Sequence, residues 1–571
     1  MFRRNKLLKS LGFLLFTAFI AGVLRPGEGS AQGNLYSGDG LEYYYRILQV
    51  SGLSDETSSF TLRPVQPDTD LTTDQHPWRQ HVYGDTDAKN YLPGNIGKLH
   101  FHEPVLFQSV NSALPRGNND GAIWQGKGYN TAFTAGVEAS LGPLYIQFRP
   151  VMGMAQNREF DLGPYNIPTV RTPQGRVAGS EYAYRDFMGR VDYVQRFGDE
   201  TYSWFNLGDS SVELRYWGVR LALSNQRIWT GPAVNTSLQY GYSAPGLRHV
   251  NFGTYRPLQT PVGDFEFSYI FGGQQKSDYF DRDDIRERLQ SIHSLVFIYS
   301  PGFVPGLSVG AVRTFMLPYP DSFENFKNQT LKLFESTVRA GLDNGGPDPD
   351  NQVASGFARW VHPDAGLDVY FEYGRNDHNI DLRDFRLQPN HHRAYTLGMI
   401  KTFDLPLNRL LSVGVEINQL EAMRTVITRG DNYMGGWYMH ANQVLGFTNR
   451  GQILGTGYGP GVNMQMIRGD LFDPRGSLSF KFARITYHNS RTDQFFNRIQ
   501  AANEKEVTRT DVRNIELMAG AEVTAFLNYG IELSAALEQS FILNHHNLSG
   551  NDVTNTRLEL VLRKQIRGWK R

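Results

Sequence analysis

The chain contains no cysteine among its 571 residues. It therefore cannot form disulfide bonds, a cysteine-ligated zinc or iron–sulfur site, or a thiol nucleophile. An excess of charge of either sign is also missing, because 57 basic residues balance 57 acidic ones. A balanced charge provides no electrostatic footprint for nucleic acid. The mean hydropathy of −0.42 excludes a bundle of membrane-spanning helices, which needs runs of about 20 apolar residues.

The first 31 residues have the pattern of a secretory signal peptide. Basic side chains at positions 3, 4, 6 and 9 precede an apolar run from Leu11 to Leu24 and small residues at Gly29-Ser30-Ala31. We predict cleavage after Ala31 and export of the chain that begins at residue 32. An uncleaved membrane anchor is the alternative.

From about residue 130 onward, apolar and polar residues alternate in many segments. In one of them, four apolar residues alternate with small or polar ones: Leu411, Val413, Val415 and Ile417. Successive side chains of a strand point to opposite faces, so each segment predicts a strand with one apolar and one polar face. The region contains candidates for about 16 to 18 strands.

Two architectures produce this alternation: soluble antiparallel sheets with an apolar core, and a membrane barrel with an apolar exterior and a polar lumen. The segments run for about ten residues, the length a tilted strand needs to cross a bilayer. Their polar faces carry acids and arginines, and aromatic residues lie near many strand ends. We therefore predict an all-β fold, a large antiparallel transmembrane β-barrel of about 16 to 18 strands. A β-sandwich or propeller array is the soluble alternative.

Residues 32–128 differ. They are predicted to form a small, partly helical N-terminal periplasmic or plug element packed under the barrel at 129–571, with a disordered leader as the alternative. Within them, an apolar helical face ends at Gly52. Residues 152–205 and 421–475 are predicted as loops that fill the lumen. Helical spacing of apolar residues also predicts a loop helix at Phe323–Ala340 and a shorter one at Asp283–Leu295.

Three stretches carry motifs: Asn111 to Tyr129 (NSALPRGNNDGAIWQGKGY), Gly218 to Phe271 with its Trp-Thr-Gly-Pro turn, and the glycine-rich Tyr433 to Gly459. Together they resemble the Wzi family of capsule-assembly outer-membrane proteins. The resemblance implies a barrel of roughly eighteen strands with a periplasmic helical part and extracellular loops that partly plug its mouth. It also implies a surface lectin that attaches or organises capsular polysaccharide.

Polysaccharide binding needs aromatic faces for sugar rings and planar polar groups for hydroxyls and uronates. Two clusters in the motif stretches offer these groups; the first is Asn225, Arg227, Trp229, Arg248 and His249, and the second is Tyr433, Trp437, Tyr438 and His440. The alternative for each is a loop-folding motif whose tryptophan packs inside the mouth. A third group, Asn119, Asp120 and Trp124, is predicted to form a turn or plug contact, with binding as the alternative.

No catalytic constellation stands out. Tyr487, His488 and Ser490 are near neighbours in sequence, and adjacent residues of a strand face opposite ways. The pairs His391-His392 and His545-His546 have no third ligand at a fixed spacing, so no metal and no cofactor are predicted.

The sequence thus predicts a non-enzymatic protein of the cell outer membrane that binds and organises capsular or extracellular polysaccharide at the cell surface. Its partners would be that polysaccharide and outer-membrane lipid, with no nucleic acid, and it would act as a monomer. An outer-membrane porin or saccharide channel of the same architecture is the alternative function.

Overall fold

The computed structural model describes residues 40–54, 57–65, 76–79, 97–162, 170–172, 175–177, 182, 184, 191–280, 290–335, 350–376, 386–390, 392–421, 436–440, 443–488 and 513–564. The predicted signal peptide and the candidate residue Tyr433 lie outside these ranges. In the described residues, no helix is long and apolar enough to cross a bilayer.

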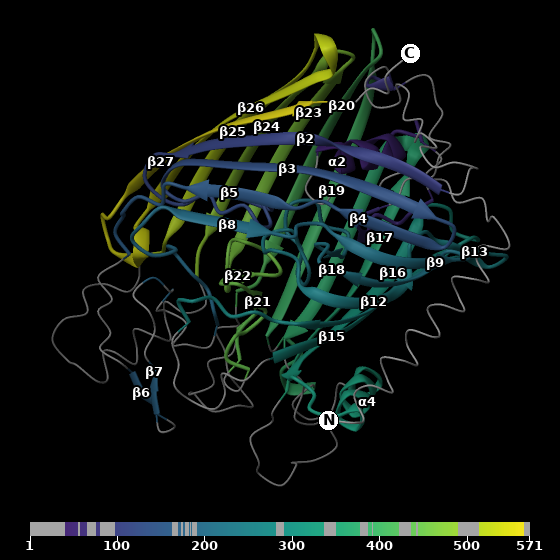
Figure 1. The fold of residues 1–571 in the computed structure, drawn as a ribbon. Coiled ribbons are helices and arrows are strands. Elements are labelled where there is room, and N and C mark those ends of the chain that lie inside the picture. Colours follow the sequence, from purple (N-terminus) through teal and green to yellow (C-terminus); the bar gives the residue numbers. More distant parts are fainter. Residues whose placement is uncertain are drawn as a thin grey trace.

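Eighteen antiparallel strands of the described chain close into one barrel (Figure 1). Neighbours in sequence are neighbours in the barrel, and the last strand pairs with the first, Leu106 opposite Leu562. Three barrel strands consist of two segments each: β4 with β5, β8 with β9, and β12 with β13. The segments are β2 (Gly97–Asn111), β3 (Gly128–Leu141), β4 (Leu144–Phe148), β5 (Val151–Ala155), β8 (Tyr202–Asn206), β9 (Ser211–Tyr216), β10 (Val219–Ser224), β12 (Arg248–Thr254), β13 (Leu258–Thr260), β14 (Gly263–Gly273), β15 (Gln290–Pro301), β16 (Leu307–Pro318), β17 (Asn351–His362), β18 (Leu367–Asn376), β19 (Arg393–Leu405), β20 (Arg409–Gln419), β23 (Asn463–Asp473), β24 (Gly476–Thr486), β25 (Ile515–Leu527), β26 (Ile531–Leu543) and β27 (Val553–Lys564).

The remaining elements are short. The helices are α2 (Gly40–Val50) and α4 (Phe323–Leu331), with the 3-10 turns η4 (Lys332–Phe334), η5 (Pro363–Ala365), η6 (Asn528–Gly530) and η7 (His545–Asn547). Three two-stranded pairs are β1 (Leu62–Arg63) with β11 (Trp229–Thr230), β6 (Val170–Thr172) with β7 (Gly175–Val177), and β21 (Thr448–Asn449) with β22 (Gln452–Ile453). The predicted loop helix therefore begins at Phe323 as expected, whereas residues 290–295 of the second predicted helix belong to strand β15.

The alternating side chains place apolar residues outside the barrel and polar residues inside. On β27, Leu558, Leu560 and Leu562 face outward and are exposed, whereas Asn555 and Arg557 face the lumen and are buried. A soluble sandwich would have the opposite arrangement, because its apolar faces would meet in a core. The exterior apolar band is instead that of an outer-membrane barrel, in which lipid covers the outer wall. The soluble alternative is therefore wrong.

The two ends of the barrel differ. Short turns join the strands at one end, and these carry aromatic residues that are 80–87% exposed: Trp217, Phe303 and Tyr529. Long connections join the strands at the other end. Outer-membrane barrels have short periplasmic turns and longer extracellular loops, with aromatic girdles at both interfaces. The short-turn end is therefore periplasmic, and the long connections form the extracellular mouth.

The N-terminal element lies inside the periplasmic end of the lumen rather than beneath it. Helix α2 presents Arg46, whose Nη2 lies 2.9 Å from an Asp368 carboxylate oxygen on β18. Arg359 of β17 donates to the same carboxylate, with 3.0 Å between Nε and the oxygen. The barrel also begins earlier than the predicted boundary at residue 129, because β2 pairs with both β3 and β27.

Residues 225–247, which connect β10 to β12, fill the middle of the lumen. Gln239 is fully buried there; its amide donates to Ser355 of β17 and accepts from Thr314 of β16, both at 2.8 Å. The backbone amide of Val234 donates to Glu416 of β20 at 2.7 Å. These bonds tie the segment to strands β16, β17 and β20 of the wall. The lumen is predicted to be filled by 152–205 and 421–475. The described residues 436–440 and 443–462 do pack in the core inside the barrel, and the segment 225–247, which was not predicted to fill the lumen, packs against them.

Candidate functional site

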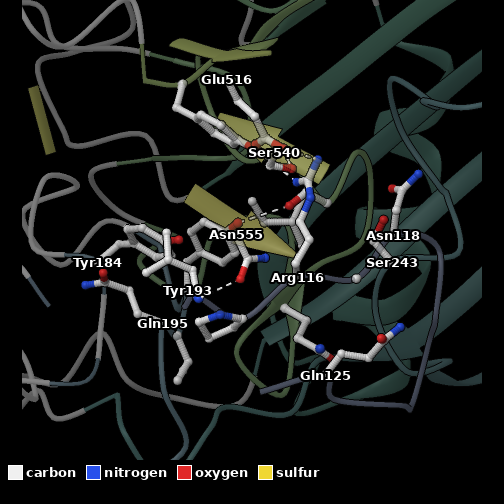
Figure 2. Close-up of a pocket in the computed structure, with 18 of the residues that line it drawn as sticks. Arg116, Asn118, Gln125, Tyr184, Tyr193, Gln195, Ser243, Glu516, Ser540 and Asn555 are labelled. Atoms are coloured by element: carbon white, nitrogen blue, oxygen red, sulfur yellow. Dashed lines mark hydrogen bonds and ion pairs between the residues drawn. The ribbon is translucent and has the colours of Figure 1, made fainter. Parts of the chain in front are cut away.

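The extracellular mouth contains a cavity of about 180 Å³ enclosed by several connections. Its lining comes from residues 114–125, Tyr184 and 193–195, 452–457, 487–488 and 545–547, together with the ends of β25, β26 and β27. Figure 2 shows Tyr184, Tyr193 and Gln195 on one side of this pocket and Asn118 and Ser243 on the other. The cavity is smaller than the roughly 300–1,000 Å³ that encloses a drug-sized ligand. It can therefore enclose one part of a longer molecule.

Arg116 lines the pocket and is held by several partners. Its guanidinium lies 3.0 Å from Glu516 and 3.4 Å from Glu538, and it donates to the Tyr487 hydroxyl at 2.9 Å. The group also lies 5.0 Å from the centroid of the Tyr458 ring. Because these partners belong to the barrel wall and its extracellular end, the contacts of Arg116 fix the position of the connection 112–127.

One wall of the pocket is aromatic. The rings of Tyr184 and Tyr193 stack at a centroid distance of 4.4 Å, and the His488 ring lies 5.4 Å from Tyr184. This wall is anchored from behind, because Asp192 accepts from the Ser277 backbone amide at 2.6 Å and from its hydroxyl at 2.7 Å. Burial raises the pKa of Asp192 to about 6.

The opposite wall is the Asn-Asp-Gly turn of the first motif stretch. Asn119 has a positive φ of 58°, and its amide donates to the backbone oxygen of Asn235 at 3.2 Å, which seats the turn on the lumen segment 225–247. Burial raises the pKa of Asp120 to about 7, against the opposing charge of Arg557. Asp120 therefore changes its charge near neutral pH, directly at the pocket.

Among the buried polar atoms of residues that line the pocket, Trp124 Nε1 and Asn514 Oδ1 make no hydrogen bond within the described chain. The Trp124 ring packs edge-on against Phe197 at 4.7 Å. An indole donor and an amide acceptor are the groups that recognise sugar hydroxyls. At the rim of the pocket, burial lowers the pKa of His545 to about 3, so this imidazole is neutral at physiological pH. Within the described ranges, no three acidic or histidine side chains are grouped to ligate a metal.

The first cluster of predicted ligand-binding residues lies outside this pocket. The ring of Trp229 is 1% exposed, and the Arg63 guanidinium covers it at 4.1 Å from the ring centroid. Arg227 is half-buried and forms a 2.7 Å ion pair with Asp209. Trp229 and Arg227 therefore hold the lumen segment in place, and the Trp229 ring presents no free face to a sugar.

The other members of the first cluster are dispersed around the start of β12. Asn225 is half-buried, and its backbone amide donates to Ser210 at 2.8 Å. His249 is buried, with Nδ1 2.8 Å from the Leu247 carbonyl oxygen, whereas Arg248 is exposed. Of the first cluster, Arg248 alone offers an exposed side chain in the described chain.

The second cluster is likewise internal. The Trp437 indole is 1% exposed and donates to the His392 carbonyl at 2.9 Å. The Tyr438 ring is fully buried, and its hydroxyl donates to the Leu238 carbonyl at 2.8 Å. His440 is half-buried and accepts from the Gln443 amide. The prediction that Trp437 and Tyr438 form an exposed sugar platform is thus wrong, because both rings belong to the apolar core inside the mouth.

Sequence reasoning gave less weight to the residues that the structure brings together. For Asn119, Asp120 and Trp124 the sequence predicts a turn or plug contact, with binding as the alternative, and it offers Tyr487, His488, His545 and His546 only for catalysis or metal binding. All seven line the pocket. Tyr184 and Tyr193 lie outside the three motif stretches, so no sequence pattern indicated a role for them. The signal that could have found the pocket is the motif stretch 111–129, which contributes one whole wall.

Fold and site together define a class: an outer-membrane barrel with a filled lumen, whose extracellular connections form an aromatic and polar pocket instead of an open channel. The family model "Capsule assembly protein Wzi" matches residues 102–556. The match extends over most of the chain, so this protein belongs to the Wzi family of capsule assembly proteins.

One solved structure with a TM-score above 0.5 has the same fold. The chain is similar to Wzi of Escherichia coli, described as an outer membrane protein involved in group 1 capsule assembly and a carbohydrate-binding β-barrel, with a TM-score of 0.57 at 11% sequence identity. That similarity covers 93% of this chain and 99% of that chain. OprD of Pseudomonas aeruginosa has a TM-score of 0.39 at 9% identity, covering 84% and 96% of the two chains. No curated protein sequence has a significant match.

Proposed function

We propose that this protein binds and organises capsular polysaccharide at the cell surface, as a monomer and without catalysing a reaction. The observation that carries the proposal is the pairing of a filled lumen with a polar, aromatic pocket at the extracellular mouth. A filled lumen favours holding a polymer over passing solutes, and the family of capsule assembly proteins and the carbohydrate-binding E. coli relative support the same function.

The pocket is suited to one or a few units of a long glycan. The Tyr184–Tyr193 wall can pack against the C–H face of a sugar ring, as aromatic side chains do with flat apolar surfaces. Trp124 Nε1 and Asn514 Oδ1 can serve ring hydroxyls as donor and acceptor. A polymer that repeats the same unit can occupy such a small site from many positions along its length, so retention needs no deep groove.

Titration of the purified, detergent-solubilised barrel with capsular polysaccharide tests the proposal. Replacing Tyr184 with alanine should weaken binding about tenfold, since an aromatic packing partner is worth about 0.5–1.5 kcal/mol beyond its buried area. Tyr319→Ala is the matched control, because Tyr319 is an exposed tyrosine at the same end of the barrel and outside the pocket.

The same two variants should differ in the same direction in cells. Deleting the gene should release capsule into the medium, and the Tyr184→Ala chain should restore attachment less well than the Tyr319→Ala chain at equal barrel levels. Capsule that stays fully attached after deletion would contradict the proposed function. Large, steady single-channel conductance of the intact protein would favour the porin alternative.

A further inference from the structure

The connection between β16 and β17 turns back onto the outer wall of the barrel. Its helix α4 lies near the end of β15 (Figure 1), and the turn η4 that follows it contacts β15 and β16. Phe326 contacts the Phe271 ring at a centroid distance of 4.9 Å, and Leu333 packs against Phe315 and Leu317. These wall residues lie in the outward-facing rows of β14 and β16, the rows that lipid covers elsewhere on the barrel.

This element covers a polar patch on the outside of the barrel. Three neighbouring strands each point one polar side chain outward there: His293 of β15, Arg313 of β16 and Gln352 of β17. Arg313 donates to the Leu333 carbonyl at 3.1 Å and to the Gln352 side chain at 3.2 Å. His293 Nε2 lies 3.2 Å from the Gln329 side-chain oxygen on α4. Lipid hydrocarbon would leave these groups unsatisfied, and the helix supplies their partners.

Three large apolar side chains of this element are exposed, beside polar residues such as Glu324, Lys327 and Asn328. Phe323, Leu331 and Phe334 are 77%, 51% and 71% exposed. The helix is nevertheless well formed, because the Ser322 side chain caps its first turn by accepting from the Asn325 amide. Large exposed apolar side chains grouped on a short capped helix are the pattern of an element that lies in a membrane interface.

We propose that α4 and η4 form an interfacial anchor whose Phe323, Leu331 and Phe334 side chains lie in the outer leaflet, at the boundary of headgroups and acyl chains. The occupant of this face is membrane lipid, because the face is continuous with the lipid-facing rows of β14 and β16. The element thereby replaces a polar patch of the wall with an apolar surface. The anchor does not depend on glycan binding.

The absence of cysteine in the chain makes a direct test possible. Phe323→Cys and Phe334→Cys are labelled singly with a nitroxide, and the full-length mature protein is reconstituted in phospholipid vesicles. Collisions with oxygen, which concentrates in the bilayer, are compared with collisions with a water-soluble nickel chelate. Asn328→Cys, exposed on the same helix, reports water, and Leu560→Cys on the outer wall reports lipid.

We expect the oxygen-to-nickel ratio at positions 323 and 334 to approach that at 560 and to exceed that at 328. A ratio equal to that at 328 would overturn the proposal, because the face would then lie in water. Low collision rates with both reagents would also overturn it, since a second copy or another protein would then cover the face. Two labelled positions keep the test decisive if one variant does not fold.

Discussion

Replacing Asp368 with asparagine tests the contacts that hold helix α2 inside the periplasmic end of the lumen. The Asp368 carboxylate is fully buried, and it accepts from Arg46 of α2 at 2.9 Å and from Arg359 of β17 at 3.0 Å. The substitution keeps the shape of the side chain and removes its charge. Two buried guanidinium groups then lie side by side with no shared counter-charge between them.

The expected size of the effect follows from these contacts. Removing one partner of a buried ion pair costs about 3–5 kcal/mol. Tyr44, Ile47 and Leu48 of α2 are also fully buried, and each contributes about 1.5–3 kcal/mol to docking. The helix should therefore remain docked in most molecules but open about a hundred- to several-thousand-fold more often, since each 1.4 kcal/mol is a factor of about ten.

Hydrogen exchange of the α2 amides measures this opening directly. In the Asp368→Asn barrel the amides of residues 40–50 should exchange faster by that factor, while those of strand β27 keep their rates. Asp404→Asn is the control, because Asp404 is exposed at the periplasmic end of β19. Unchanged amide exchange of α2 in the Asp368 variant would refute the reasoning that the ion pairs of Asp368 hold this helix in the lumen. Planar-bilayer recordings should still show no steady channel, because residues 225–247 remain in the lumen.

Two further predictions concern the pocket. Because burial raises the pKa of Asp120 to about 7, an acidic capsular polysaccharide should bind more weakly at pH 8 than at pH 6, and Asp120→Asn should remove most of this difference in the same titration. The raised pKa also means that the stability this group contributes is full below about pH 4 and is lost as the pH rises through 7. Gly121→Ala should lower the melting temperature by several degrees, at a cost of about 1–3 kcal/mol, because φ is +61° and a Cβ would lie 2.6 Å from Arg227 Cδ. Gly550→Ala, whose φ is +77° but whose Cβ would meet no heavy atom within 4 Å, should cost less and so isolates the contact in thermal unfolding.

The barrel was predictable because successive side chains of a strand point to opposite faces, so odd and even positions separate into an outer and an inner row. The outward leucines of β27 and the buried polar residues between them follow this rule directly. Strand β2 was missed because a register shift between His102 and Val105 breaks the alternation and reverses the parity. The predicted boundary at residue 129 therefore came one strand too late.

The burial of two tryptophans in the predicted ligand-binding clusters has a different origin. Trp229 and Trp437 stand in glycine-rich connections, where an aromatic residue can project from the mouth or fold into it. Both fold inward, because the lumen of this barrel contains an apolar core and is no water-filled channel. No local pattern distinguishes these outcomes, since the partners of Trp229 and Trp437 come from residues 63 and 392.

By itself, the sequence determined the all-β class, the direction in which each regular strand faces and the absence of thiol chemistry, because these depend on residue type and on neighbours two positions apart. Only the tertiary structure decided which connection fills the lumen, which aromatic residues are buried, and that Tyr184, Asp120 and Asn514 meet at one pocket. Those outcomes rest on contacts between segments that lie tens to hundreds of residues apart. Barrel closure creates such contacts, and no window of sequence contains them.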